Sequence, residues 1–403
     1  MKRSLLALSA FLAVLASPRA ARSDFHGCLA GLKSQAAAKG ISAASFAAAT
    51  QGIRPDMTVL ELMDRQPEFE TPIWDYLATL VDEERVADGR AAMQQWGAAL
   101  AAAEARYGVD RHILAAVWGV ESNFGKDKGE RPLVQSLATL SCYASRRRAY
   151  FAGELMAALH IIQRGDVRAN RLTGSWAGAF GHTQFMPSTF RRFAVDLDGD
   201  GRRDVVDSVP DALGSTANFL RKARWNPGLP WGYEVKLPAG FDASLAGRRR
   251  KRPTASWAAM GVTRVDGSPL AELGAAGLLL PAGPRGPAFL VTKNFDALYS
   301  YNAAESYGLA IAVLSDRLRG RPGVRTPWPT NDRGLSRAER RELMRLLARH
   351  GYDVGEPNGR LGAKAHAAIR DVERRIGMTP TGRPGGRVLE ALRGTVLRPA
   401  AGP

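Results

Sequence analysis

A single glutamate, Glu121, stands at the end of an apolar segment, and its setting suits acid catalysis. Residues 111–121 carry apolar side chains at helical spacing and follow Asp110, a residue type that favours the start of a helix. Burial and the negative end of a helix both disfavour a charged carboxylate, so the pKa of Glu121 should be raised. A carboxyl group that stays protonated near neutral pH can act as a general acid. The alternative is an ordinary capping or salt-bridged glutamate on the surface.

Two later segments have a composition that suits a sugar-binding wall. Residues 174–188 combine small residues, which permit close backbone approach, with aromatic rings and with the hydrogen-bonding groups of Ser175 and Gln184. Residues 294–302 end on Tyr301 and Asn302. Sugar rings present both hydroxyl edges and flat C–H faces, and such mixed segments can contact both. The alternative for both segments is loop and core packing.

Together these motifs resemble the lytic murein transglycosylase B family. They lie in order at residues 120–125, 174–178, 184–187 and 294–302, and the resemblance covers about residues 28–320. It implies a lysozyme-like fold that cleaves the glycan strands of peptidoglycan, with Glu121 as the single catalytic acid and base. The residues that the resemblance places along the substrate are Ser175, Gln184, Tyr301 and Asn302 in the cleft, and Arg146, Arg147 and Tyr150 around the saccharide and its peptide.

One glutamate is sufficient for this reaction if the sugar itself supplies the nucleophile. Hydrolytic glycosidases usually need two carboxylates, and Asp127 and Glu130 are near Glu121 only in sequence. Glu121 would protonate the oxygen between MurNAc and GlcNAc, and the N-acetyl group of MurNAc would stabilise the anomeric carbon. The carboxylate would then remove the proton of the MurNAc 6-hydroxyl, which attacks and leaves a 1,6-anhydro end. The alternatives are a lysozyme-type hydrolase and a non-catalytic wall-binding scaffold.

An acidic segment at residues 196–207 fits a twelve-residue calcium-binding loop of the EF-hand kind. Gly201 occupies the sixth position, where the loop turns sharply, and Arg202 would offer its backbone carbonyl. Acidic residues stand at positions 1, 3, 5, 9 and 12, which are Asp196, Asp198, Asp200, Asp204 and Asp207. We predict a single structural Ca²⁺ that braces the cleft; the alternative is a solvated acidic turn.

Residues 334–393 are similar to the small helical peptidoglycan-binding domain. Leu335, Leu343, Leu346 and Leu347 form one apolar helical face. Fourteen basic and seven acidic residues lie between residue 334 and the last residue, 403. The resemblance implies a module that holds the enzyme on its polymer, with a positive charge that suits peptide-stem carboxylates. The alternative is a docking domain for a protein partner.

The N-terminus and the overall charge indicate where the protein acts. Two basic residues precede the apolar run at residues 5–16, as in a secretory signal peptide, which we expect over residues 1–22. The net charge of +17 favours a polyanionic partner. For an exported protein that partner is the cell wall, so we expect no nucleic acid partner despite the basic cluster at residues 248–252, taken as a solvent- or envelope-facing loop. We expect a soluble periplasmic monomer without a lipid anchor or a transmembrane segment in the mature chain.

Export also bears on the two cysteines. An oxidising compartment favours a disulfide between Cys28 and Cys142, and the alternative is two buried free thiols. Two cysteines exclude a four-cysteine zinc site, and the histidines lack the spacing of a zinc hydrolase.

The elements that must position these residues are mainly helical. Helical patterns cover residues 28–105, with examples at 46–50 and 86–107, and recur at 149–163, 211–223 and 304–318. Strands are expected at residues 232–237 and 288–292. The predicted fold class is mainly α, an α+β lysozyme-like catalytic domain with a small β-containing insertion and an EF-hand-like loop, plus a small helical C-terminal domain. The predicted boundaries are a signal peptide at 1–22, the catalytic domain at 23–319, a Pro/Gly linker at 320–333 and the peptidoglycan-binding domain with its tail at 334–403.

Overall fold

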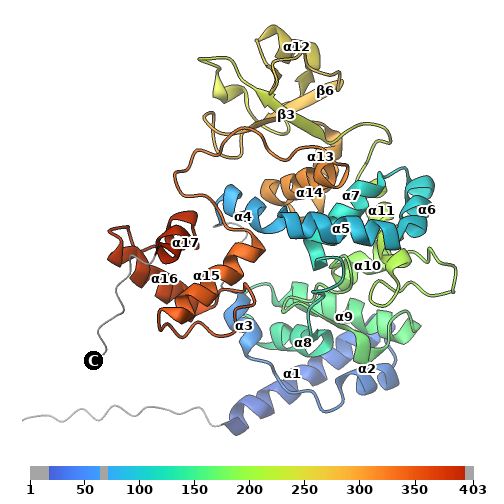
Figure 1. The fold of residues 1–403 in the computed structure, drawn as a ribbon. Coiled ribbons are helices and arrows are strands. Elements are labelled where there is room, and N and C mark those ends of the chain that lie inside the picture. The colour runs from blue at the N-terminus through green and yellow to red at the C-terminus, as the bar shows by residue number, and fades with distance from the viewer. Residues whose placement is uncertain (1–17, 64–70, 395–403) are drawn as a thin grey trace, which may run out of the picture. The chain divides into compact units, whose positions relative to one another are not determined.

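The computed structural model describes residues 18–63 and 71–394 (Figure 1). The chain divides into two compact units. The first combines residues 1–64 with 130–179, and the second combines residues 65–129 with 180–403. Each unit is therefore assembled from two segments that are distant in the sequence. The apolar run of the predicted signal peptide lies outside the described residues.

The first unit is helical. Its elements are the helices α1 (Pro18–Ala38), α2 (Ala43–Thr50), α3 (Thr58–Met63), α8 (Leu133–Tyr143) and α9 (Arg148–Arg164), the 3₁₀ helix η2 (Ala169–Arg171), and the paired strands β1 (Arg131–Pro132) and β2 (Thr173–Gly174). The apolar faces of α8 and α9 pack against each other. A disulfide joins Cys28 in α1 to Cys142 in α8, with 5.9 Å between the Cα atoms. The helix predicted at residues 149–163 is confirmed as α9.

The second unit has a helical core. Its helices are α4 (Ile73–Leu80), α5 (Glu83–Gln95), α6 (Gly97–Tyr107), α7 (Arg111–Ser122), α10 (Pro187–Phe193), α11 (Val209–Lys222), α13 (Lys293–Asn302) and α14 (Glu305–Leu318). The helices predicted at residues 211–223 and 304–318 are confirmed. The helical pattern at residues 86–107 is confirmed as α5 and α6, which the non-helical backbone of Trp96 separates.

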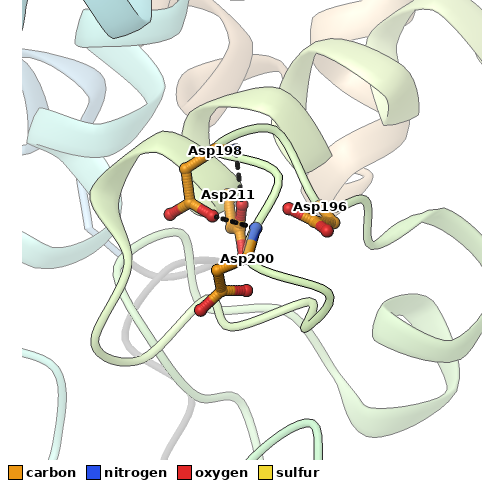
Figure 2. Close-up of side chains that lie close together, drawn as sticks. All are labelled: Asp196, Asp198, Asp200 and Asp211. Atoms are coloured by element: carbon orange, nitrogen blue, oxygen red, sulfur yellow. Dashed lines mark hydrogen bonds between the residues drawn. The ribbon is translucent and has the colours of Figure 1, made fainter.

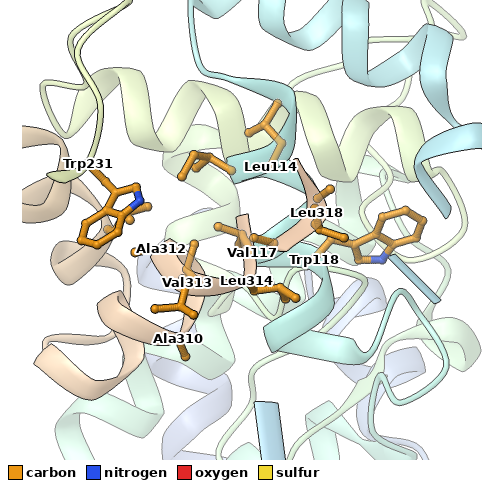
Figure 3. Close-up of a cluster of buried hydrophobic side chains, with 14 of the residues drawn as sticks. Leu114, Val117, Trp118, Trp231, Ala310, Ala312, Val313, Leu314 and Leu318 are labelled. Atoms are coloured by element: carbon orange, nitrogen blue, oxygen red, sulfur yellow. The ribbon is translucent and has the colours of Figure 1, made fainter. Parts of the chain in front are cut away.

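Helices α7 and α14 lie against each other in this core (Figure 3). Leu114 and Val117 of α7 and Leu314 of α14 are fully buried. The same cluster includes Trp231, which lies beside the first long strand. Because α7 is buried along most of its length, its last residues are held firmly.

A five-stranded antiparallel sheet adds the β part, in the order β4-β6-β7-β3-β5. Its elements are β3 (Gly232–Lys236), β4 (Arg252–Pro253), β5 (Thr263–Arg264), β6 (Ala275–Leu279) and β7 (Ala288–Val291), with η3 (Ala243–Leu245) and α12 (Thr254–Ala259) between them. Side chains alternate between the two faces of the sheet. Phe289 and Val291 join the helical core, whereas Leu290 packs with Trp257 in a separate cluster. The predicted strands at residues 232–237 and 288–292 are confirmed.

The basic cluster at residues 248–252 is not a solvated loop throughout, contrary to our expectation. The Arg248 side chain is only 8% exposed, forms an ion pair with Asp296 and lies 3.7 Å above the centre of the Tyr299 ring. Lys251 forms a second ion pair with Asp296, at 2.7 Å. Asp296 and Tyr299 belong to α13, so Arg248 and Lys251 fix this helix, whereas Arg249, Arg250 and Arg252 are exposed.

Three helices make a small bundle near the C-terminus: α15 (Arg337–Arg349), α16 (Ala363–Arg375) and α17 (Gly386–Arg393). Ser336 and Glu339 form a reciprocal capping box at the start of α15. Leu343, Ile369 and Leu389 lie in its fully buried core. The mainly helical fold with a small sheet and a helical C-terminal part is therefore confirmed.

The segment between α14 and α15 is irregular, as its prolines and glycines predict. It is nevertheless anchored, because the Glu234 carboxylate accepts hydrogen bonds from the backbone N–H groups of Arg325 and Thr326 at 2.7 and 2.8 Å. Trp328 packs against the helical core. Within residues 18–63 and 71–394, none of the helices combines the length and the apolar character needed to cross a membrane.

Candidate active site

Glu121 is the penultimate residue of α7, as the sequence predicts. The Asp110 side chain caps the start of this helix and accepts a hydrogen bond from the His112 N–H at 2.8 Å. Because α7 is buried over residues 113–119, the packing of the core fixes where its C-terminal end presents Glu121.

The turn after Glu121 has an unusual backbone. Asn123 and Phe124 adopt left-handed conformations, with φ of 49° and 59°, which non-glycine residues visit rarely. The Phe124 ring packs directly on Gly119, where an added Cβ would come within 2.5 Å of the ring. Only glycine at position 119 permits this close packing, which lets the aromatic ring hold the turn against its own helix.

Burial raises the pKa of the Glu121 carboxyl to about 8. Tyr307 opposes this effect because its phenol O–H donates a hydrogen bond to Glu121 Oε1. Tyr307 comes from α14 and is 2% exposed. At neutral pH the Glu121 carboxyl is therefore mostly protonated, with a neutral hydrogen-bond donor in place to stabilise the carboxylate once the proton leaves.

No second carboxylate among the described residues shifts the pKa of Glu121. Asp127, the nearest acid in the sequence within this unit, is largely exposed and forms an ion pair with Arg360 at 2.7 Å. Glu130 belongs to the first unit. Around Glu121 the described residues thus provide one carboxyl group with a raised pKa and no carboxylate coupled to it.

Tyr301 lies beside Tyr307, with the two rings stacked and their centres 6.0 Å apart. Its O–H donates to the Thr183 carbonyl at 2.7 Å. Burial, and then the charge of Glu121, raise the pKa of Tyr301 well above its usual range, so the phenol stays neutral. Asn302 follows as the last residue of α13 and is exposed.

Gln184 stands in the loop that precedes α10, and its side chain is used to hold that loop. The residue has a left-handed backbone, with φ of 50°. Its amide donates hydrogen bonds to the carbonyl of Gly181 at 2.8 Å and to that of Lys128 at 3.0 Å. Since Lys128 follows α7 in the sequence, Gln184 connects the loop to the segment after Glu121.

His182 makes a second connection between this loop and α7. The Trp118 indole N–H donates to His182 Nδ1 at 3.1 Å, and the Ser122 hydroxyl donates to the His182 carbonyl at 2.5 Å. Burial and the nearby Lys128 charge lower the pKa of His182 to about 4, so the imidazole is neutral. Gly125 must be glycine here, because an added Cβ would lie 2.5 Å from the His182 ring.

The remaining predicted binding residues belong to the first unit. Ser175 stabilises a tight turn, since its hydroxyl accepts a hydrogen bond from the Ala179 N–H at 3.0 Å. The two predicted arginines, Arg146 and Arg147, have different contacts. Arg146 donates to the Met63 carbonyl at 3.1 Å, whereas the Arg147 guanidinium lies 4.3 Å above the centre of the Tyr150 ring. Tyr150 is 38% exposed and can contact a ligand.

The acidic loop gathers four carboxylates: Asp196, Asp198, Asp200 and Asp211 each place an oxygen within 4.8 Å of the others (Figure 2). The loop turns as predicted, because Asp196 accepts a hydrogen bond from the Gly201 N–H at 2.8 Å. Burial and the Asp198 charge raise the pKa of Asp211 to about 6. Hard carboxylate oxygens at this density form a donor set that suits Ca²⁺.

Asp207, the predicted twelfth-position ligand, is not a member of this cluster. Asp204 turns the chain instead, because its carboxylate accepts the N–H groups of Val206 and Asp207. The following helix consequently starts only at residue 209. Asp211 in its first turn reaches back to the loop and accepts the Leu197 N–H at 2.7 Å. The fourth carboxylate of the cluster thus comes from Asp211, four residues after Asp207.

Sequence reasoning missed two residues, Tyr307 beside Glu121 and Asp211 in the acidic cluster. Tyr307 falls inside an apolar helix, and only its spacing of six residues from Tyr301 gave a weak signal. Asp211 lies beyond the twelve-residue loop, in a helix that the sequence already indicated. Both act through contacts between elements, which the periodicity of a single element does not reveal.

Two family models match the sequence. The model of the transglycosylase SLT domain matches residues 24–316, and that of the peptidoglycan binding domain matches residues 336–392. Membrane-bound lytic murein transglycosylase B of Escherichia coli (strain K12) is 33% identical to this chain over 272 residues, which are 64% of this chain and 73% of that protein.

Solved structures give the same picture. SltB3 from Pseudomonas aeruginosa, in complex with NAG-anhNAM-pentapeptide, is 45% identical with a TM-score of 0.74, and the match covers 92% of this chain and 99% of SltB3. The Escherichia coli lytic transglycosylase Slt35 is 28% identical with a TM-score of 0.63, and the match covers 75% of this chain and 95% of Slt35. Slt35 has been solved with bulgecin A and with calcium.

Proposed function

The chain belongs to the transglycosylase SLT domain family and is a lytic transglycosylase that acts on peptidoglycan, and from this premise we propose that Glu121 is its single catalytic acid and base. The observation that carries the proposal is the Glu121 carboxyl group, whose pKa is raised to about 8 and which has no second described carboxylate coupled to it. A hydrolase would need a second carboxylate to activate water or to form a glycosyl intermediate. No other described carboxylate shifts the pKa of Glu121.

In the first step the protonated Glu121 donates its proton to the glycosidic oxygen between MurNAc and GlcNAc. The bond from the MurNAc anomeric carbon to that oxygen breaks, and GlcNAc leaves with a free 4-hydroxyl group. The acetamido oxygen of MurNAc stabilises the positive charge on the anomeric carbon. The Tyr307 hydrogen bond stabilises the Glu121 carboxylate that this step produces.

In the second step the Glu121 carboxylate removes the proton of the MurNAc 6-hydroxyl. The oxygen attacks the anomeric carbon, displaces the acetamido oxygen and closes the 1,6-anhydro ring. Glu121 is protonated again, so the enzyme returns to its starting state without consuming water. Burial favours this return because it disfavours the charged carboxylate.

We further propose that the remaining predicted residues position the substrate. Tyr301 and Gln184 each use their polar group on a backbone carbonyl, so they shape the wall near Glu121. Asn302 and the Arg147–Tyr150 pair are exposed and can contact hydroxyl groups and peptide carboxylates directly. Ser175 and Arg146 would hold the segments that carry these contacts.

The acidic loop is proposed to bind one Ca²⁺ through Asp196, Asp198, Asp200 and Asp211, with the Arg202 carbonyl as a further ligand. The support is the crowding of four carboxylates in a chain that is otherwise basic, and the raised pKa of Asp211. Calcium would neutralise this repulsion and brace the loop that precedes α11. Its proposed role is structural and not chemical.

The enzyme is proposed to act as an exported monomer in the periplasm after loss of residues 1–22. Support comes from the N-terminal pattern, from the Cys28–Cys142 disulfide and from the peptidoglycan substrate. We propose a catalytic domain at residues 23–319, a linker at 320–333 and a wall-binding module from residue 334 onward. The module would raise the local concentration of glycan strands around the catalytic residue.

Mass spectrometry of the muropeptides released from purified peptidoglycan tests the proposed chemistry, with Glu121→Gln as the matched variant. Products one water lighter than hydrolysis fragments, lost in the variant, support anhydro-ring formation through Glu121. Products with reducing ends would make the chain a lysozyme-type hydrolase. Full activity in the variant would exclude Glu121 as the acid, and bound sacculi without any product would leave only a wall-binding scaffold.

A further inference from the structure

Arg337 links the first helix of the C-terminal bundle to both α5 and α7. Arg337, at the start of α15, surrounds the Asp82 carboxylate: its Nε and Nη2 donate to the two oxygens at 2.9 Å each, and its backbone N–H donates at 2.9 Å. The two side chains are only 17% and 3% exposed. Asp82 is also the N-cap of α5, where it accepts the Arg85 N–H at 2.8 Å.

The same guanidinium reaches the end of α7. Arg337 Nη1 donates to Asn123 Oδ1 at 2.9 Å. Asn123 caps α7 in a left-handed conformation, two residues after Glu121. From the first turn of α5, Arg85 donates to the Gly119 carbonyl, two residues before Glu121. The Gly119 carbonyl and the Asn123 side chain, on either side of Glu121, are therefore held by two arginines that both bond to Asp82.

Three other ion pairs join the bundle to the rest of the second unit, and their contacts differ from those of Arg337. Arg383 pairs with Asp75 of α4 at 2.6 Å, Arg341 pairs with Glu84 of α5, and Arg360 pairs with Asp127 at 2.7 Å. Both side chains of the Arg341–Glu84 pair are substantially exposed, at 33% and 44%. These pairs can hold the bundle in place, but Arg337 alone among them bonds to the residue that caps α7.

We propose that Arg337 is a positioning residue for Glu121, which makes full catalytic activity depend on docking of the peptidoglycan-binding bundle. The inference rests on the proposed catalytic role of Glu121. When the bundle is docked, Arg337 fixes the Asn123 side chain and with it the left-handed turn that ends α7. When the bundle undocks, Asp82 and Asn123 lose their shared partner, and the end of α7 becomes free to move.

The chemistry of the contact requires an arginine. A planar guanidinium can engage a carboxylate with two parallel N–H groups while a third N–H reaches another acceptor. The lysine ammonium is a compact point charge on a flexible stem and cannot reproduce this fork. Arg337→Lys should therefore keep the charge of the bundle but lose the link between Asp82 and Asn123.

The test compares full-length variants in the release of anhydro-muropeptides from sacculi at several substrate concentrations. Arg337→Gln removes the link from the side of the bundle. Asn123→Gly removes the acceptor and keeps the left-handed turn, which glycine adopts freely. Arg341→Gln breaks an exposed ion pair of the same contact region and serves as the matched control. Thermal unfolding and sedimentation with sacculi check folding and wall binding.

We expect Arg337→Gln and Asn123→Gly each to lower kcat by about tenfold, because small displacements of catalytic groups are costly, with little change in KM or sacculus binding. The two reductions in kcat should not multiply in the double variant, because both substitutions remove the same hydrogen bond between Arg337 and Asn123. Arg337→Lys should resemble Arg337→Gln, and Arg341→Gln should keep the normal kcat.

Three results would overturn the inference. They are an unchanged kcat in Arg337→Gln, a loss of sacculus binding that accounts for the whole effect, and multiplying effects of Arg337→Gln and Asn123→Gly. Glu121→Gln, measured alongside, separates this inference from the proposed function. If Glu121→Gln is inactive and Arg337→Gln has a normal kcat, only the positioning role of Arg337 is rejected. If Glu121→Gln is active, the catalytic role of Glu121, on which the inference rests, is rejected.

Discussion

Replacement of Tyr307 by phenylalanine tests the hydrogen bond that counteracts the effect of burial on the pKa of Glu121. The change removes one hydroxyl group from a side chain that is 2% exposed and leaves the ring in its stack with Tyr301. A hydrogen bond to a charged group contributes about 1.5–3 kcal/mol. Because one pKa unit corresponds to about 1.4 kcal/mol, the pKa of Glu121 should rise by roughly one to two units.

The rise in the Glu121 pKa sets the direction in which the pH profile should move. Tyr307 stabilises the carboxylate, so its loss keeps Glu121 protonated to higher pH. The basic limb of kcat/KM reports the acid in the free enzyme, and in the wild type it should lie near the Glu121 pKa of about 8. In Tyr307→Phe the limb should move upward by roughly one to two pH units. The plateau below pH 7 should fall severalfold, because a weaker acid transfers its proton less readily.

Tyr301→Phe is the matched control for this experiment. Tyr301 is a neighbouring, partly buried phenol, but its O–H donates to the Thr183 carbonyl and not to Glu121. Loss of this hydroxyl group can alter the rate through the packing beside Glu121, while the basic limb should stay in place. A limb in Tyr307→Phe that is unmoved, or that moves to lower pH, would refute the assignment of Tyr307 as the group that stabilises the Glu121 carboxylate.

Three further predictions concern stability and metal binding. The pKa of Glu121 rises from 4.5 to about 8 on folding, so the free energy of unfolding of the wild type should fall by at most about 5 kcal/mol as the pH rises between these values. Urea unfolding at several pH values should show that Glu121→Gln lacks this fall in stability. The same pH dependence in the wild type and the variant would contradict the prediction. Asp211→Asn should abolish the rise in unfolding temperature on adding Ca²⁺, and Asp207→Asn should retain it; the reverse result would restore Asp207 as the ligand. The Cys28–Cys142 bridge spans 114 residues, so alanine at both positions should lower the unfolding free energy by about 2–5 kcal/mol, and an unchanged denaturation midpoint under oxidising conditions would argue against this estimate.

Local patterns in the sequence were sufficient for the elements that carry the chemistry. Asp110 and the apolar residues of α7 predict a buried helix that ends at Glu121, and the structure confirms this helix. Helix periodicity and capping depend on residues within one or two turns of each other, so they can be read from the chain directly. The raised pKa of Glu121 followed from the same local reasoning.

The identity of the partners across elements was decided only by the tertiary structure. Tyr307 reaches Glu121 across 186 residues of sequence, and Arg337 reaches Asn123 across 214. Arg248 has the sequence context of a solvated basic loop but is buried because α13 supplies Asp296 and Tyr299. Pairing of this kind depends on how helices pack, and it leaves no periodic trace in the sequence.

The acidic loop depends both on local sequence spacing and on the packing of helices. Spacing alone predicted the first three carboxylates of the cluster and the turn at Gly201, because these lie on one short segment. The last carboxylate depended on where α11 begins, and so on how Asp204 turns the chain before it. The sequence by itself therefore determined which residues could do chemistry here, and the packing of helices determined which neighbours set their charge and position.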